Sequence, residues 1–285
     1  MAQPPMNHGA EEWGSDFFGG LNELPPEPVA GIGQVLDTMA TLPAFRDARQ
    51  WLLGSLDVQS GGSILEAGCG NAASHADLHA MVGPRGRIVG IDPTKAFIET
   101  ARSRSKQQGP AHATYETGDI RALPCKDAEF DAVFCDKVLI HAGPASAALR
   151  EMARVTRPGG RVGAIEWLPF FAISATDLAA LAAFNTIFQK AVYEYYVSAN
   201  LARHFHAAGL ENIRTSAFLA HTTSLDEPPF WRAFIVHQIP MFLQAELIDE
   251  PQARAFLKDI EALNAAGEFN ASFTVQAATG TKSLA

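Results

Sequence analysis

Cysteine and basic residues are scarce in this 285-residue chain, and both shortages narrow its class. Three cysteines cannot form a fully paired disulfide framework, which favours reduced thiols and a cytoplasmic setting. Lys and Arg number 22 against 31 Asp and Glu, giving a net charge of −9, so the general basic footprint of a nucleic-acid-binding protein is absent. We therefore expect a small-molecule partner and no nucleic acid.

Long apolar runs, a basic-then-apolar leader and reactive-residue motifs are also missing. The most apolar stretch, 168–188, contains Asp177 and Asn185, so it is a poor candidate for a membrane span. No signal-peptide pattern, Cys-x-x-Cys pair or Gly-x-Ser-x-Gly nucleophile elbow is seen. These absences predict a protein without membrane insertion, without a metal site and without a hydrolase nucleophile.

What the chain does contain is a glycine turn between an apolar strand and a helix. Residues 64–72 read Ile-Leu-Glu-Ala-Gly-Cys-Gly-Asn-Ala, and glycine at 68 and 70 lets the backbone approach a ligand closely. Asp92 ends the next apolar strand 22 residues after Gly70 (92 − 70), where a ribose diol would be held. Alone the turn is weak evidence, because dinucleotide-binding folds use similar turns.

Three further segments end an apolar strand in polar residues or begin a new strand after a turn. They are 113–120, which ends in Thr-Gly-Asp-Ile, 130–137, which ends in Cys-Asp-Lys, and 151–162, where a helix meets Arg-Pro-Gly-Gly. Alternating strands and helices imply a parallel sheet with helices on both faces. Ligands bind beyond the carboxyl ends of such strands, so the polar residues there are the candidates for a site.

In the order and spacing of these motifs the chain resembles the class I S-adenosylmethionine-dependent methyltransferases, above all the small-molecule branch that includes the ubiquinone/menaquinone C-methyltransferases. The resemblance covers about residues 40–166. It implies an α/β fold with a doubly wound, mostly parallel seven-stranded sheet and a helical cap formed by insertions. It also implies S-adenosyl-L-methionine as cofactor and S-adenosyl-L-homocysteine as product. Ala72 departs from the family, which often has a third glycine there.

The resemblance assigns a set of cofactor-binding residues along these motifs. They are Glu66, Gly68, Gly70, Asp92, Pro93, Asp119, Ile120, Asp136 and Lys137. Asp92 would bind the ribose, Asp119 and Ile120 would flank the adenine, and Asp136 with Lys137 would line the methionine end. For the last pair, a simple surface ion pair is the alternative.

Methyl transfer from a sulfonium asks little of a catalytic residue. The leaving group is good, so positioning and the exclusion of water carry most of the rate, and a base is needed only where the acceptor must lose a proton. His141, in a Leu-Ile-His element past the fourth strand, is the candidate base, unless it only caps a helix or bonds the backbone. Glu166, at the end of the fifth strand, either orients an amine or hydroxyl or forms a salt bridge within the cap.

Aromatic residues outside the core favour an apolar or aromatic substrate. The candidate substrate-binding residues are Phe17, Trp167, Tyr193, Tyr196 and His221. Alternatively, the aromatic residues of the cap form only its own core.

The chain divides into six predicted segments. They are an N-terminal tail or lid (1–33), the cofactor-binding core (34–166), a helical cap insertion (167–197), the core continued (198–223), a second cap insertion (224–268), and a last strand with a tail (269–285). The first segment is rich in Pro and Gly like a disordered tail, but its aromatic residues are many for a solvated one. A cap of this size is also a candidate surface for a homodimer.

The sequence therefore predicts transfer of a methyl group to carbon, oxygen or nitrogen of a small metabolite, in quinone or secondary-metabolite biosynthesis. One alternative is a cyclase or other non-methylating enzyme that holds the same cofactor, since fold does not fix chemistry. A nicotinamide-dependent oxidoreductase is a second, against which Asp119 and the Pro-Gly-Gly turn argue. A cofactor-binding module without activity is the third.

Overall fold

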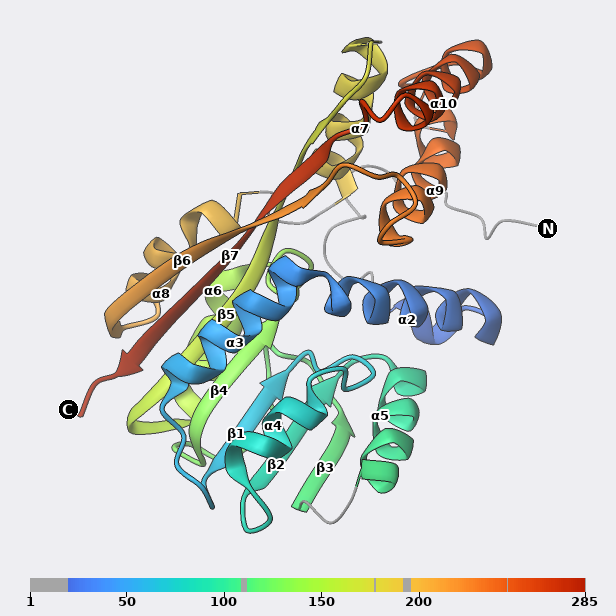
Figure 1. Ribbon diagram of the computed structural model, residues 1–285. Coiled ribbons are helices and arrows are strands. Elements are labelled where there is room, and N and C mark those ends of the chain that lie inside the picture. Colours follow the sequence, from blue (N-terminus) through green and yellow to red (C-terminus); the bar gives the residue numbers. More distant parts are fainter. Residues whose placement is uncertain (1–19, 109–111, 177, 192–195, 245, 285) are drawn as a thin grey trace.

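The computed structural model describes residues 20–108, 112–176, 178–191, 196–244 and 246–284 (Figure 1). Its sheet has seven strands in the order β3-β2-β1-β4-β5-β7-β6. Their bounds are β1 Ser63–Ala67, β2 Arg87–Asp92, β3 His112–Thr117, β4 Phe130–Asp136, β5 Thr156–Ile173, β6 Leu210–Thr222 and β7 Ala271–Lys282. Strands β1 to β5 pair in parallel, and β7 runs antiparallel between β5 and β6. The predicted doubly wound, mostly parallel sheet is confirmed.

Helices cover both faces of this sheet. Their bounds are α2 Pro26–Thr41, α3 Pro43–Leu56, α4 His75–Val82, α5 Lys95–Gln108, α6 Ala145–Val155, α7 Leu178–Ala191, α8 Leu201–Ala207, α9 Phe230–Gln244 and α10 Glu250–Ala265, with 3-10 turns η1 Leu21–Glu23 and η2 Ser198–Asn200. Ile64 packs in the apolar cluster under α3 and α4, and Leu65 packs in the cluster under α6 and α8. Neighbouring side chains of a strand point to opposite faces, which separates the two clusters.

Strand β5 is longer than the sequence predicted. Residues 167–173 continue the strand to Ile173, where a helical cap was expected to begin. The run is apolar without clear alternation, and the pairing with β7 shifts between Leu168 and Ala172, around Pro169, which has no N–H to give to the ladder. The long strands β5, β7 and β6 thus rise together above the rest of the sheet and carry α7, α9 and α10 at their upper end (Figure 1). We call this three-stranded extension the arm.

Helix α2 also begins before the predicted boundary at residue 34. It starts at Pro26, in the first helical turn, where proline costs no hydrogen bond. Val29 and Gly33 are buried, and Val29 packs with Leu21 and Phe97. Residues 26–33 are therefore helix and not tail. The prolines in this segment suggested a tail, but proline is also common in the first turn of a helix.

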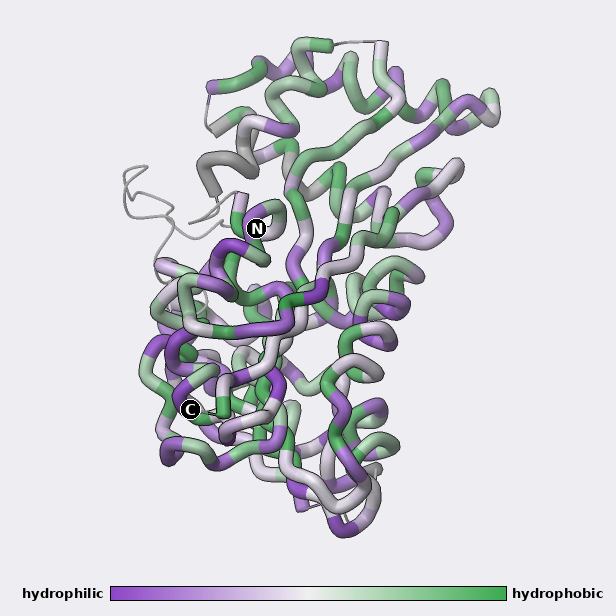
Figure 2. The backbone as a smooth tube through the Cα atoms, turned by 90° about the vertical axis from the view of Figure 1, so that its left-hand side faces the viewer, coloured by the Kyte–Doolittle hydropathy of each residue, from purple (hydrophilic) through white to green (hydrophobic). Residues whose placement is uncertain are grey.

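An aromatic cluster fills the junction of the arm and the helices above it. Its members are Trp167, Phe171, Phe184, Phe230, Trp231, Phe234 and Phe273. The Trp167 ring lies 5.7 Å from Phe171 and 5.8 Å from Phe273, both edge to face, a geometry that adds about 0.5–1.5 kcal/mol per pair beyond burial. Along the backbone of this upper part, hydrophobic stretches alternate with hydrophilic ones (Figure 2). These aromatic residues form the core of the cap, which was the alternative to a substrate pocket.

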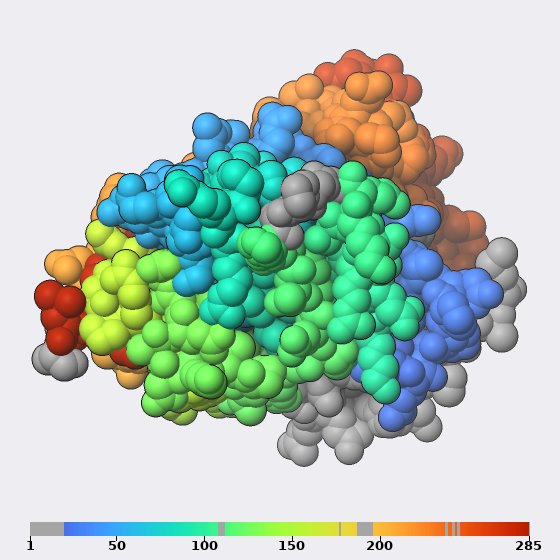
Figure 3. Space-filling model, turned by 90° about the horizontal axis from the view of Figure 1, so that it is seen from below, coloured from blue at the N-terminus to red at the C-terminus, as the bar shows by residue number. Residues whose placement is uncertain are grey.

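The amino ends of the parallel strands lie at the lower pole of the molecule (Figure 1), the face that Figure 3 presents. A hollow of about 130 Å³ there is lined by Asp57, Gln59, Asp131, Arg157 and Gly160, among others. An ion pair between Arg157 and Asp131, 2.6 Å long, ties its sides together. This hollow is remote from the strand ends where ligands bind in such sheets. Across the described ranges, no helix has the length and apolarity needed to cross a membrane.

Candidate cofactor and substrate site

The glycine turn joins β1 to α4 at the carboxyl edge of the sheet. Gly68 and Gly70 have φ angles of 80° and 51°, in the left-handed region that favours glycine. A Cβ at Gly68 would lie 2.3 Å from a methyl group of Val138, whereas a Cβ at Gly70 would meet no atom within 4 Å. Gly68 thus admits the segment after β4, and Gly70 borders open space. Ala72 also has a positive φ, 60°, which explains why a glycine suits that position.

Asp92 ends β2 directly beside this turn. Its Oδ2 accepts the Gly70 N–H at 2.9 Å and its Oδ1 accepts the Thr94 N–H at 2.8 Å. The residue is 5% exposed, and burial raises the pKa of its carboxyl although both N–H groups oppose the rise. The Thr94 side chain is a third hydrogen-bond partner, which leaves about one of the four acceptor sites of the carboxylate for a hydroxyl donor. An open cradle at Gly70 next to this carboxylate fits the adenosyl ribose that the sequence assigned to Asp92.

Pro93 follows at the turn after β2 and meets the N-terminal segment. Its carbonyl oxygen accepts from the Asn22 side chain at 2.9 Å, and Asn22 in turn accepts the Lys95 N–H at 2.9 Å. The segment that begins at Gly20 is therefore docked next to the predicted ribose site.

Helix α2 covers the glycine turn, which the sequence analysis did not foresee. Asn71 donates to the Gly33 carbonyl at 3.2 Å. Arg104 of α5 binds both carboxylate oxygens of Asp37 in α2, at 2.9 and 2.6 Å, and the Asn71 carbonyl at 3.2 Å. The sequence did not indicate that Arg104 and Asp37 form a pair, because they are 67 residues apart.

Glu66 lies beneath the turn among buried polar side chains. It accepts from the Ser74 hydroxyl, and burial raises its pKa to about 7, against the effect of that bond. Next to it, the Tyr115 hydroxyl lies 2.5 Å from Nδ1 of His75. Glu66 therefore supports the turn from behind, through α4.

His75 and His79 form a pair that the sequence analysis overlooked. They are four residues apart on α4, a spacing found in metal-binding helices, with ring centroids 6.4 Å apart. Over the part of the chain that the structure describes, no group of three His, Cys, Asp or Glu side chains is arranged to hold a metal ion. We assign the pair to packing under the glycine turn.

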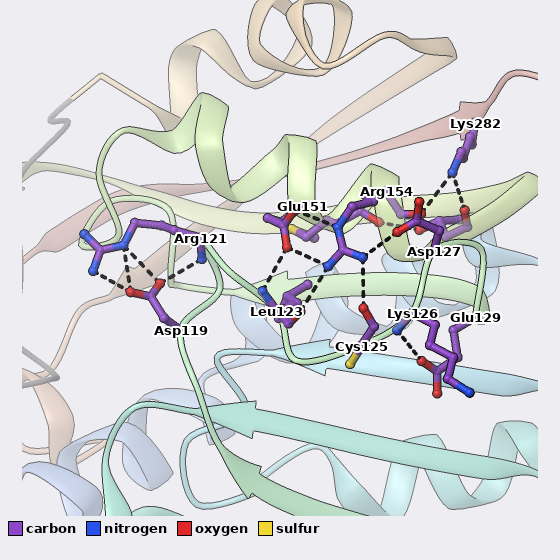
Figure 4. Close-up of polar contacts among 12 residues, drawn as sticks. Asp119, Arg121, Leu123, Cys125, Lys126, Asp127, Glu129, Glu151, Arg154 and Lys282 are labelled. Carbon is purple, nitrogen blue, oxygen red and sulfur yellow. Dashed lines mark hydrogen bonds and ion pairs between the residues drawn. The ribbon is translucent and has the colours of Figure 1, made fainter.

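Asp119 is tightly engaged by a residue that the sequence analysis missed, Arg121. Its carboxylate accepts the Arg121 backbone N–H at 2.7 Å and the guanidinium at 2.6 and 3.0 Å (Figure 4). Burial alone would raise the pKa of Asp119, but the Arg121 bonds lower it overall. Ile120 is buried between them. The spacing of an acid and a basic residue two positions apart could have indicated this pair in the sequence.

The segment after Asp119 is braced from α6. Arg154 binds Asp127 at 2.7 Å, Glu151 at 2.7 Å and the Leu123 carbonyl at 3.0 Å, and Glu151 accepts the Leu123 N–H at 2.9 Å (Figure 4). Lys282 of β7 donates to the carbonyls of Arg154 and Thr156. This network holds the predicted adenine side of the site rigid.

Asp136 and Lys137, after β4, form a buried ion pair and not a surface one. Asp136 accepts from Lys137 at 2.6 Å and from Arg49 of α3 at 3.0 Å. Burial would raise the pKa of Asp136, but Lys137 and Arg49 hold it below its usual value. The Lys137 ammonium also lies 4.8 Å from the Phe45 ring centroid. Arg49 escaped notice because it stands on an otherwise apolar helix face.

His141 ends a short turn after β4. The N–H groups of His141 and Ala142 both donate to the Val138 carbonyl at 2.9 Å. Burial lowers the pKa of His141 to about 4, so its imidazole is neutral at pH 7, but the same lowering makes it a weak base. The residue keeps partial exposure.

Glu166 lies against the same turn from β5. The side chain is 0% exposed, and its Oε1 accepts the N–H groups of Val138 at 2.9 Å and Leu139 at 2.6 Å. Burial raises its pKa to about 8, against the effect of the Leu139 bond. Its hydrogen bonds thus go to the backbone after β4 and not to a cation of the cap.

The candidate substrate residues are spread over separate elements. Trp167 is 6% exposed within the aromatic cluster, on the face of β5 opposite to Glu166. Tyr196 is 60% exposed before η2. His221, near the upper end of β6, lies 3.1 Å from the Asn270 amide. Phe17 and Tyr193 lie outside the described residues.

Comparisons with known proteins agree with this geometry. Residues 64–160 match the family described as a methyltransferase domain. An uncharacterized 37.1 kDa protein in transposon TN4556 of Streptomyces fradiae is 40% identical over 134 residues, which cover 46% of this chain and 38% of that protein. The demethylmenaquinone methyltransferase of Lactococcus lactis is 30% identical over 138 residues, which cover 47% of this chain and 55% of that enzyme. The chain thus spans less than two thirds of either relative.

Solved structures share the fold over nearly the whole chain. The YcgJ protein from Bacillus subtilis has a TM-score of 0.59 at 18% identity, over 84% of this chain and 99% of that one. The [4+2]-cyclase SpnF has a TM-score of 0.56 at 16% identity, over 95% and 98%. The chain is therefore related to the class I S-adenosylmethionine-dependent methyltransferases. Within that class, its similarity extends to the demethylmenaquinone methyltransferases.

Proposed function

We propose that the protein is an S-adenosyl-L-methionine-dependent methyltransferase that acts on a small, apolar or aromatic metabolite. The observation that carries this proposal is the bond from the Gly70 N–H to Asp92, beside open space at the carboxyl ends of β1 and β2. Binding in this position is typical of nucleoside cofactors on such sheets. The match to a methyltransferase domain supports the same cofactor.

Each predicted cofactor residue has a role in this proposal. Asp92 accepts the ribose hydroxyls, with Pro93 shaping the turn beside it. Asp119 and Ile120 flank the adenine, and Asp136 with Lys137 lies at the methionine end. Glu66, Gly68 and Gly70 form the turn itself. When bound, the cofactor supplies a methyl group activated by the sulfonium.

Catalysis in this proposal rests on orientation. The chain holds the acceptor in line with the methyl group and excludes water, which supplies most of the rate in such a displacement. His141 takes the proton from the acceptor hydroxyl, amine or carbon as the new bond to the methyl group makes that proton acidic, because a pKa of about 4 makes the imidazole a weak base. No covalent bond between the substrate and the protein is needed in this reaction.

The wider setting follows from the same reasoning. A cytoplasmic metabolite of quinone or secondary metabolism is the proposed substrate, and Tyr196 and His221 are its proposed contacts among the described residues. The N-terminal segment acts as a lid, since Asn22 docks it beside Pro93. A homodimer would form through the cap.

Calorimetric titration with S-adenosylhomocysteine tests the cofactor assignment. Asp92→Ala should weaken binding by about 1–3 kcal/mol, the cost of losing a charged hydrogen-bond partner. Glu250→Ala, an exposed acid of α10 paired with Arg254, serves as the control and should bind like the wild type. A folded wild type that binds nicotinamide cofactors instead would contradict the proposal.

A non-methylating enzyme on this fold is the second candidate, favoured by the structural likeness to the [4+2]-cyclase SpnF. The mass of the product separates the two. A transferase adds one methyl group to its substrate, whereas a cyclase leaves the mass unchanged.

A further inference from the structure

We infer that Glu166 is a positioning residue, whose carboxyl group holds the turn after β4 and thereby seats both His141 and the glycine turn. We define this turn as the 138–142 turn. The inference rests on the proposed function for its catalytic consequence. It replaces a direct role of Glu166 on the substrate by a role exerted through the backbone.

The first support is the bonding at the start of the 138–142 turn. Three successive N–H groups bond to β5: Lys137 donates to the Ile165 carbonyl at 2.8 Å, and Val138 and Leu139 donate to Oε1 of Glu166. The first N–H groups of a helical turn have no acceptor within the turn, and a carboxylate satisfies them as a cap does. Here the cap comes from a residue 27 to 28 positions away in the sequence.

The second support is the backbone conformation just before the turn. Lys137 has a φ of 62°, in the left-handed region that a residue with a side chain rarely adopts. Such a conformation persists only where the surroundings over-determine it. The bond from the Lys137 N–H to Ile165 and the bonds from the next two amides to Glu166 supply that constraint.

The third support is what the turn contacts. The Val138 side chain lies so close to Gly68 that a Cβ there would be 2.3 Å from one methyl and 2.9 Å from the other. At the other end of the turn, the His141 N–H is bonded to the Val138 carbonyl. A displacement of Val138 therefore has two effects. It moves His141, the candidate base, and it removes the contact that supports the glycine turn at Gly68.

The fourth support is that the carboxyl group costs stability where it stands. Glu166 is fully buried, and its Oε2 is without a hydrogen-bond partner among the described residues. A buried unsatisfied polar group is destabilising, and an apolar side chain would avoid that penalty. An apolar side chain would leave the amides of Val138 and Leu139 without their acceptor.

Glu166→Gln and Glu166→Ala separate the two roles. Glutamine keeps a carbonyl oxygen for both amides, so S-adenosylhomocysteine affinity and kcat/KM should stay within about threefold of the wild type, as for a conserved neutral acceptor. Alanine removes the acceptor and should weaken cofactor binding and lower kcat by about tenfold or more, the effect of a loosened catalytic geometry. If both variants lose kcat/KM equally while both bind the cofactor like the wild type, Glu166 acts directly on the substrate and the inference is overturned.

Hydrogen exchange tests the positioning without any activity. The amides of Val138 and Leu139 should be protected in the wild type and in Glu166→Gln, and should exchange faster by about tenfold or more in Glu166→Ala. Equal protection in all three proteins would overturn the inference. This measurement stands even if the proposed function fails, which the wild-type titration with S-adenosylhomocysteine reports separately.

Val138→Ala keeps the inference testable if Glu166→Ala does not fold. It removes the contact with Gly68 but leaves both backbone bonds to Glu166 in place. Cofactor affinity should fall by several-fold while both amides remain protected. Unchanged affinity would show that the turn does not support the glycine turn and would overturn that part of the inference.

Discussion

At the scale of single residues, Gly68 and Gly70 differ in what a side chain would meet: Val138 at Gly68 and open space at Gly70. Gly70→Ala should cost about 1–2 kcal/mol of unfolding free energy for its left-handed backbone, and its methyl group should enter the cofactor cradle and raise the Kd for S-adenosylhomocysteine by about tenfold. Gly68→Ala should cost about 2–5 kcal/mol, since the overlap with Val138 adds to the same backbone term. Urea denaturation and calorimetry on both variants measure these effects. Equal losses of stability would contradict this division.

Prediction at the level of residues reaches chemistry that is local in sequence. Asp92 was predicted because a strand end, a glycine turn and a fixed spacing all belong to one strand–helix–strand unit, and the structure places it beside that turn. Its binding of a cofactor stays a prediction. Arg121, two residues from its partner Asp119, was within reach of the same reasoning. Arg49 was not, because its partner Asp136 is 87 residues away and only the folded chain brings them together.

At the scale of elements, Arg49 fastens α3 to the end of β4. Arg49→Ala removes one of the two cations that bind the buried Asp136 carboxylate, while Lys137 remains as its partner. The free energy of unfolding should therefore fall by about 1.5–3 kcal/mol, the contribution of a hydrogen bond to a charged group. The matched control is Arg254→Ala, whose exposed pair with Glu250 should contribute about 0.5 kcal/mol or less. Urea denaturation of both variants measures the difference. Similar losses in the two would show that the Arg49 pair does no more than a surface pair.

The elements of the sheet were predictable from alternating strands and helices, but their lengths were not. Strand β5 passes its predicted end in a segment where buried Trp167 and Phe171 alternate with exposed residues. The exposed residues, Phe170 among them, are also apolar, so the hydropathy of the sequence showed no period of two. Helix α2 was hidden because Pro26 and Pro28 read equally as a tail or as a helix start. In both cases the local sequence allows two structures, and contacts with segments distant in the sequence determine which one forms.

At the scale of the whole molecule, burial of Glu166 makes stability depend on alkaline pH. Its folded pKa of about 8 lies above its ordinary value of 4.5, so its stabilising contribution is full below pH 4.5 and is lost as pH rises through 8. Between pH 7.5 and 9 the wild type should lose about 1 kcal/mol more than Glu166→Gln. Denaturant titration at both pH values measures this. Parallel pH profiles for the two proteins would contradict the raised pKa.

The arm has a consequence for how such a protein can change. Helix α7 follows the upper end of β5, and α9 and α10 lie between the upper ends of β6 and β7. Every helix of the cap is therefore inserted at one rim, whereas the turns that carry Gly70, Asp92 and Asp119 belong to the opposite half of the sheet. A chimera that exchanges the segments beyond Ile173 and Thr222 would receive a foreign cap with its own cofactor half intact. Under the proposed function, the part of the chain that selects the acceptor could therefore be exchanged while the part that binds the donor stays unchanged.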